Sequence, residues 1–209
     1  MNAQTERLEL AGPAGRIQVL RDQPAEAARG VALVAHPHPL FGGTIDNKVV
    51  QTLARAFVQC GWTALRFNFR GVGTSEGVHD NGEGEALDLL HVVRELAPQG
   101  PLALAGFSFG AFVTARALQS LWSEREPRAI VLVGTAAARF TVPELPPASH
   151  DRTLVIHGEV DDTVPLAAAL DWARPQSLPV TVVPGVEHFF HGQLPLLKSL
   201  VVRHLRAQG

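Results

Sequence analysis

Apolar residues occur along the chain in short unbroken runs, separated by longer stretches of mixed polarity. The runs VALVA, LALAG, IVLVG and LVIHG do not alternate with polar positions, which is typical of strands covered by helices on both faces. Eight runs are expected to form strands: Arg7–Leu10, Arg16–Leu20, Val31–Ala35, Thr63–Asn68, Leu102–Ala105, Ala129–Val133, Leu154–His157 and Val180–Val183.

The stretches between these runs are amphipathic and predict helices. The expected helices are Thr44–Cys60, Glu83–Leu96, Phe109–Ser123, Pro165–Ala173 and Leu194–Arg206. Alternating strands and helices favour right-handed crossovers and a mostly parallel sheet. The first two strands are joined only by AGPAG, which is too short for a crossover, so they should form an antiparallel hairpin. The predicted fold class is an α/β three-layer sandwich (α/β/α) with a mostly parallel eight-stranded sheet.

Length and composition limit the organisation and the class of partner. The 209 residues suit a single domain, expected to span 1–209, and the proline-rich stretch Phe140–Arg152 is too short to form a separate cap domain. A hydrophobic fraction of 46% with 18% charged residues indicates a globular protein. The net charge of −2, without a basic run, argues against nucleic acid and anionic lipid as partners.

The single cysteine and the first residues of the chain indicate the compartment in which we expect the protein. Cys60 is the only cysteine, so neither an intrachain disulfide nor a cysteine-based metal site can form. The first ten residues lack the cationic and apolar regions of a signal peptide, and no apolar run approaches the roughly 20 residues that cross a bilayer. We therefore expect a cytoplasmic protein that is not embedded in a membrane.

The strongest local motif is GFSFG at residues 106–110, between an expected strand and an expected helix. A serine on such a tight turn needs small residues two positions away on either side, so that strand and helix can pass closely. The turn also places Ser108 at a helix N-terminus, where free N–H groups favour developing negative charge. This context predicts a nucleophilic serine.

Two later loops supply an acid and a base. Asp161 follows the run TLVIH, at the edge of the sheet where catalytic loops gather in open α/β folds. Asp162 or Thr163 could instead serve as the cap of the helix that begins near Pro165, and both interpretations can hold together. His188 follows the run TVV, and it is chosen among nine histidines because serine, acid and histidine then follow three successive strands in that order.

These three motifs resemble the α/β-hydrolase superfamily over nearly the whole chain. The segments HPHPLFGGT…DNK, FNFRGVGTSEG and AGFSFGA are similar to a smaller group of compact, lidless bacterial hydrolases related to dienelactone hydrolases and serine-peptidase-like esterases. The resemblance implies a catalytic triad of Ser108, His188 and Asp161, a fold without a cap domain, and no cofactor.

The resemblance also places an oxyanion hole between two backbone segments. One donor should be the N–H of Phe109, directly after the nucleophile, and the other should come from residues 36–43. Pro37 and Pro39 have no N–H, so His38 and Leu40 are the candidates, and Leu40 is slightly favoured. The spacing of His36 and His38 could suggest a metal site, but a turn is the simpler interpretation, and we expect no metal.

The expected function is hydrolysis of a small-molecule carboxylic ester through an acyl-enzyme. A thioesterase, or an amidase or peptidase, would use the same triad. A non-catalytic binding scaffold is the alternative from a different class, and retention of all three triad residues argues against it. The substrate, the acyl length and the oligomeric state are left open by the sequence.

Overall fold

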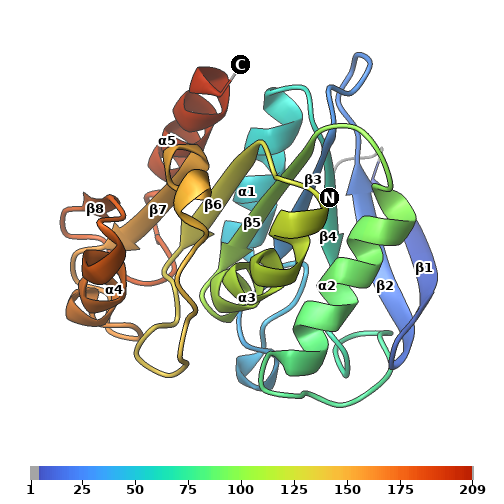
Figure 1. The fold of residues 1–209 in the computed structure, drawn as a ribbon, viewed down its shortest axis with the longest axis horizontal. Helices are drawn as coiled ribbons and strands as arrows, with labels where there is room; N and C mark the ends of the chain where they lie inside the picture. Colours follow the sequence, from blue (N-terminus) through green and yellow to red (C-terminus); the bar gives the residue numbers. More distant parts are fainter. Residues whose placement is uncertain (1–4, 209) are drawn as a thin grey trace.

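The computed structural model describes residues 5–208 and shows one eight-stranded sheet (Figure 1). Its spatial order is β1-β2-β4-β3-β5-β6-β7-β8. The strands are β1 (Glu6–Gly12), β2 (Gly15–Asp22), β3 (Val31–Ala35), β4 (Thr63–Phe67), β5 (Leu102–Phe107), β6 (Ala129–Val133), β7 (Thr153–Gly158) and β8 (Val180–Val183). β1 pairs with β2, and β2 with β4, in antiparallel fashion, whereas all other neighbours are parallel.

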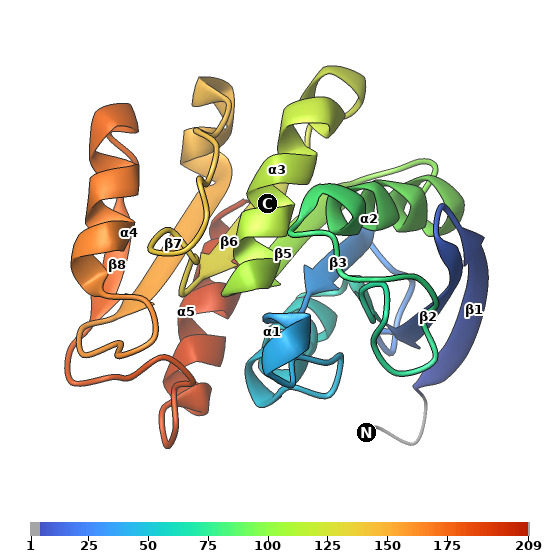
Figure 2. The same cartoon turned by 90° about the horizontal axis from the view of Figure 1, so that it is seen from below.

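Five α-helices cover the sheet on both faces. They are α1 (Lys48–Gln59), α2 (Glu83–Leu96), α3 (Phe109–Glu124), α4 (Leu166–Ala173) and α5 (Leu194–Ala207). One buried apolar cluster contains side chains of α1 and α5, and the other contains side chains of α2, α3 and α4. Figure 2 shows these two helix layers on opposite sides of the sheet. The predicted three-layer α/β/α class is confirmed.

Burial of the central strands explains their unbroken apolar sequence. Every residue of β5 and β6 is buried, because each strand has a neighbour on both edges and a helix layer on both faces. The antiparallel hairpin of β1 and β2 lies at one end of the sheet, as the short AGPAG connection predicts.

The observed elements differ from expectation mainly at helix starts and in the loops. α1 begins at Lys48 rather than Thr44, because the side chain of Asn47 accepts hydrogen bonds from the N–H groups of Val49 and Val50 and so caps the helix. Three short 3-10 helices were not predicted: η1 (Pro39–Phe41), η2 (Pro147–Arg152) and η3 (Arg174–Gln176).

The parallel strands β3 to β8 bring their carboxyl ends to one edge of the sheet, where the loops that follow them meet. The connection from β6 to β7 contains only η2, so no cap domain is inserted there within the described residues. Within residues 5–208, no helix has both the length and the apolar character needed to span a membrane.

Candidate active site

Ser108 lies on a sharp turn between β5 and α3, at the carboxyl edge of the sheet. Its backbone has φ 56° and ψ −116°, a conformation that residues other than glycine rarely adopt. A Cβ atom at Gly106 would overlap the backbone of Gly110, and one at Gly110 would overlap the backbone of Ala35. The N–H of Ser108 donates to the carbonyl of Val133 at 2.8 Å, which holds the strained turn against β6. The two glycines are therefore required for strand and helix to pass this closely.

The structure brings Ser108, His188 and Asp161 together, although they are far apart in sequence. Nε2 of His188 lies 3.0 Å from Oγ of Ser108, and Nδ1 lies 2.6 Å from Oδ2 of Asp161. All three residues are buried. A carboxylate only accepts hydrogen bonds, so Nδ1 carries the proton that faces Asp161, and Nε2 faces the hydroxyl.

The loop after β7 fixes the second oxygen of the Asp161 carboxylate. Oδ1 accepts from the N–H of Thr163 at 3.0 Å and from the N–H of Val164 at 2.7 Å. Burial alone would raise the pKa of Asp161, but the hydrogen bonds from His188 and Val164 outweigh it and hold this pKa below its usual value. The carboxylate is thus ionised and held in one orientation.

Asp162 does not cap the following helix, so that interpretation is wrong. Its side chain is exposed and contacts only Oγ1 of Thr163, at 3.2 Å, within the described residues. Helix α4 begins at Leu166, with Pro165 at the N-cap position and without a side-chain cap. The backbone N–H groups of Thr163 and Val164, just before this helix, donate to Asp161 instead.

Gly134 and His157 lie beside His188 and Asp161, respectively, and the sequence did not predict either contact. Gly134 follows β6 with φ 56°, and a Cβ atom there would lie 3.0 Å from Cε1 of His188. Nε2 of His157 donates to the carbonyl of Val164 at 2.8 Å and lies 3.5 Å from Oδ2 of Asp161. A glycine after β6 and a histidine at the end of β7 were the available signals, but neither indicates a contact with His188 or Asp161 by itself.

The backbone N–H of Phe109 is a candidate donor to an oxyanion at Ser108. Phe109 is the first residue of α3, so its N–H has no partner within the helix. The N–H of Leu40 instead donates to Nδ1 of His38 at 3.2 Å, and Leu40 is 70% exposed. The preference for Leu40 is corrected on this ground, and His38 becomes the candidate for the second donor.

His36 forms two hydrogen bonds that hold the loop after β3 in place. Its Nδ1 donates to the carbonyl of Pro37 at 2.6 Å, and its Nε2 accepts from the N–H of Phe69 at 3.0 Å. Burial lowers the pKa of His36 to about 4, although the hydrogen bond to Pro37 acts in the opposite direction. Both ring nitrogens are occupied, so His36 and His38 are not free to bind a metal ion together.

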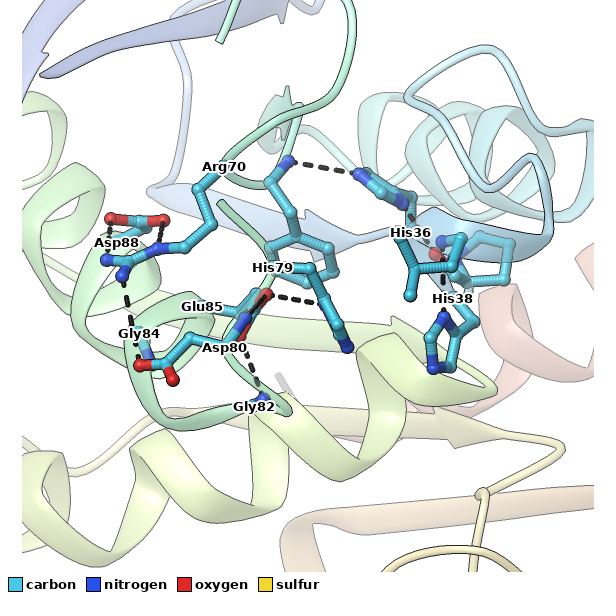
Figure 3. A network of polar contacts seen from close by, with 12 residues as sticks. His36, His38, Arg70, His79, Asp80, Gly82, Gly84, Glu85 and Asp88 are labelled. Atoms are coloured by element: carbon cyan, nitrogen blue, oxygen red, sulfur yellow. Dashed lines mark hydrogen bonds and ion pairs between the residues drawn. The ribbon is translucent and has the colours of Figure 1, made fainter. Parts of the chain in front are cut away.

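A polar network lies next to this loop (Figure 3). Arg70 forms a two-bonded ion pair with Asp88, with both nitrogen–oxygen distances at 2.8 Å. The buried carboxylate of Glu85 accepts from the N–H groups of Asp80 at 2.9 Å and Gly82 at 2.8 Å. Nδ1 of His79 lies 2.8 Å from the same carboxylate, without the alignment of a hydrogen bond. The network ties the loop after β4 to the start of α2.

A pocket of about 240 Å³ opens beside Ser108 and His188. Its walls are largely apolar and include Phe41, Phe109, Ala136, Phe140, Val164 and Phe189. A larger hollow of about 470 Å³ lies over α2 and α3, but neither Ser108 nor His188 lines it. The smaller pocket is therefore the one that contains Ser108 and His188 of the candidate triad.

Comparison with known proteins identifies the family. Residues 47–201 match the thioesterase domain family. An α/β serine hydrolase without a lid from Xanthomonas campestris is 36% identical, with a TM-score of 0.87 over 99% of this chain and 96% of that chain. An α/β serine hydrolase homologue from Coxiella burnetii is also 36% identical, with a TM-score of 0.81 over 96% of this chain and 97% of that chain.

A curated protein from Rickettsia prowazekii, described as uncharacterized, is 43% identical over 106 residues. This match covers 49% of the chain and 44% of that relative, so it spans less than half of either protein. The thioesterase match and the two solved structures, in contrast, cover most or nearly all of the chain. The chain therefore belongs to the thioesterase-domain family of hydrolases within the α/β-hydrolase superfamily.

Proposed function

We propose that the protein is a serine hydrolase that cleaves small or medium carboxylic esters through an acyl-enzyme. The observation that carries the proposal is the aligned chain from Ser108 through His188 to Asp161, with distances of 3.0 and 2.6 Å. A serine hydroxyl is a weak nucleophile unless a base removes its proton, and a neutral imidazole oriented by a carboxylate is suited to that task.

The proposed mechanism has two halves. Nε2 of His188 takes the proton of Ser108 as Oγ attacks the carbonyl carbon, and the resulting imidazolium then protonates the leaving group. In the second half, His188 removes a proton from water, whose oxygen attacks the acyl carbon. The bond to Oγ of Ser108 then breaks, the imidazolium returns the proton to Oγ, and the acid is released. Asp161 keeps the ring oriented and stabilises its charge in both halves.

Charge that develops on the carbonyl oxygen needs preorganised donors. We assign these to the backbone N–H of Phe109, at the start of α3, and to the backbone N–H of His38, after β3. The positive end of the α3 dipole acts on the same oxygen. The Nδ1 atom of His38 is occupied by Leu40, which fixes the conformation of the loop that presents this N–H.

The pocket supports an acyl group of limited size. Its apolar walls and its volume of about 240 Å³ favour a short or medium hydrophobic substituent over a long chain. A thioesterase is the second candidate, because residues 47–201 match the thioesterase domain family and the same triad cleaves thioesters. We also propose a cytoplasmic enzyme with a small-molecule substrate, not one that acts on nucleic acid or at a membrane.

Mutant kinetics test the catalytic assignment. Ser108→Ala and His188→Ala should each lower kcat on an activated ester by roughly 10⁴- to 10⁶-fold, and the double variant should lose little more, because the two residues serve one step. Matched oxygen and thiol esters of rising acyl length would separate an esterase from a thioesterase by kcat/KM. Losses that add up in the double variant would contradict a shared step.

A further inference from the structure

One cation lies among the apolar walls of the substrate pocket. Arg139 lines the pocket together with Ser108, His188 and His38, and no aspartate or glutamate is among the described residues that line it. A carboxylate directly beside Ser108 would disfavour the negative charge of the oxyanion, whereas a cation does not. The pocket therefore offers a binding group for an anion.

The position of Arg139 is set by local structure. It follows β6, where its N–H and that of Phe140 both donate to the carbonyl of Ala136 in a tight turn. Its guanidinium lies over the ring of Phe41, at 5.2 Å from the ring centroid. Stacking on an aromatic face leaves the N–H groups at the edge of the guanidinium free to bind a planar anion.

Arg139 has no acidic partner in the described part of the chain. Two buried acids of the polar network in Figure 3 have other partners: Glu85 accepts two backbone N–H groups and contacts His79, and Asp88 pairs with Arg70. The positive charge of Arg139 also acts on His38, another residue of the pocket. Burial lowers the pKa of His38, and the neighbouring His79 and then Arg139 lower this pKa further.

We propose that Arg139 selects substrates that carry a carboxylate in addition to the ester or thioester bond, and that it binds this carboxylate at the wall of the pocket. The inference rests on the proposed hydrolase function and adds a substrate class to it. A carboxylate is favoured over a phosphate because the pocket supplies one arginine, whose single positive charge balances the single negative charge of a carboxylate but not the nearly double charge of a phosphate monoester.

Matched esters test the selectivity. One pair is the mono-4-nitrophenyl ester of adipic acid and its methyl-capped form, and the other is 4-carboxyphenyl hexanoate and its methyl-capped form. We expect Arg139→Gln to lower kcat/KM for the free-carboxylate member of at least one pair by about tenfold or more, mainly through KM, and to leave the capped member within about twofold. Arg139→Lys should retain part of the preference, because the charge remains while the fork is lost.

The control is Arg203→Gln, which removes the same charge from an exposed position late in α5. Since α5 starts from the loop that carries His188, its last turns lie toward the opposite edge of the sheet, and we expect no change in selectivity. Equal losses on free and capped esters in Arg139→Gln, or none on either, would overturn the proposal. A stronger preference for a phosphonate-bearing ester would overturn the assignment to carboxylates.

Binding provides a test that does not need catalysis. In the Ser108→Ala background, calorimetric titration with monomethyl adipate should give binding that Arg139→Gln weakens by about tenfold or more, while dimethyl adipate binds both forms alike. If no ester is hydrolysed but this difference appears, the hydrolase proposal fails and the carboxylate site stands. If binding of monomethyl adipate is independent of Arg139, the carboxylate site is refuted whatever the activity.

Discussion

Replacing Asp161 with asparagine should disable the histidine while leaving the fold intact. Oδ1 of Asp161 accepts two backbone N–H groups, at 2.7 and 3.0 Å, so the oxygen of the asparagine amide will take that place. Its NH2 group then occupies the position of Oδ2, which lies 2.6 Å from Nδ1 of His188. An NH2 group only donates, so Nδ1 must become the acceptor and the ring proton moves to Nε2.

The protonated Nε2 then faces Oγ of Ser108 at 3.0 Å and cannot take its proton. The expected loss in kcat is roughly 10⁴-fold, the magnitude known for this exchange in serine-protease triads, or about 5 kcal/mol in the barrier. Because both backbone hydrogen bonds survive, the thermal midpoint should change little. Steady-state kinetics on an activated ester and thermal unfolding of the same preparation measure the two effects.

Asp162→Ala is the matched control, one residue away. Asp162 is exposed and contacts only the hydroxyl of Thr163 within the described residues, so its removal should change stability by less than about 0.5 kcal/mol and leave kcat unchanged. Retention of more than a tenth of the activity in Asp161→Asn, or a large loss of activity in Asp162→Ala, would refute the assignment of the acid to Asp161.

Two further predictions concern the support of the site. Glu85→Gln replaces one of the two accepting oxygens with an NH2 donor, which then faces a backbone N–H. The free energy of unfolding, measured in urea, should fall by about 1–3 kcal/mol, and a fall of less than about 0.5 kcal/mol would contradict this. His36 is neutral in the fold because its pKa is about 4, so its contribution to stability is fully present above pH 6.5 and is lost as the pH falls toward 4. The difference in unfolding free energy between wild type and His36→Asn should therefore shrink by about 3 kcal/mol between pH 7 and pH 4, and a difference that does not vary with pH would refute it.

The sheet could be predicted from sequence because its central strands are buried on both faces. Runs such as those of β5 and β6 are apolar at almost every position, and they coincide with strands in which every residue is buried. The start of α1 could not be predicted as well. Thr44, Asp46 and Asn47 are all able to cap a helix, and only the fold determines that Asn47 does so.

The same limit applies at the site. Chain order and strand ends were sufficient to predict that Ser108, Asp161 and His188 lie together, because the topology brings those strand ends to one edge. The choice between His38 and Leu40 depends on one hydrogen bond from a backbone N–H to a neighbouring ring, which spacing does not reveal. Arg139 likewise shows nothing unusual in sequence, since its significance comes from a pocket that several distant segments build.

The proposed mechanism requires that Ser108 is a nucleophile activated by His188. Its most direct test is reaction with a fluorophosphonate, followed by mass spectrometry of the intact protein and of its peptides. We predict a single adduct on the peptide that contains Ser108, formed at a rate that falls by several orders of magnitude in His188→Ala and absent in Ser108→Ala. A protein that stays unlabelled, or an adduct on another residue that persists in Ser108→Ala, would contradict the mechanism.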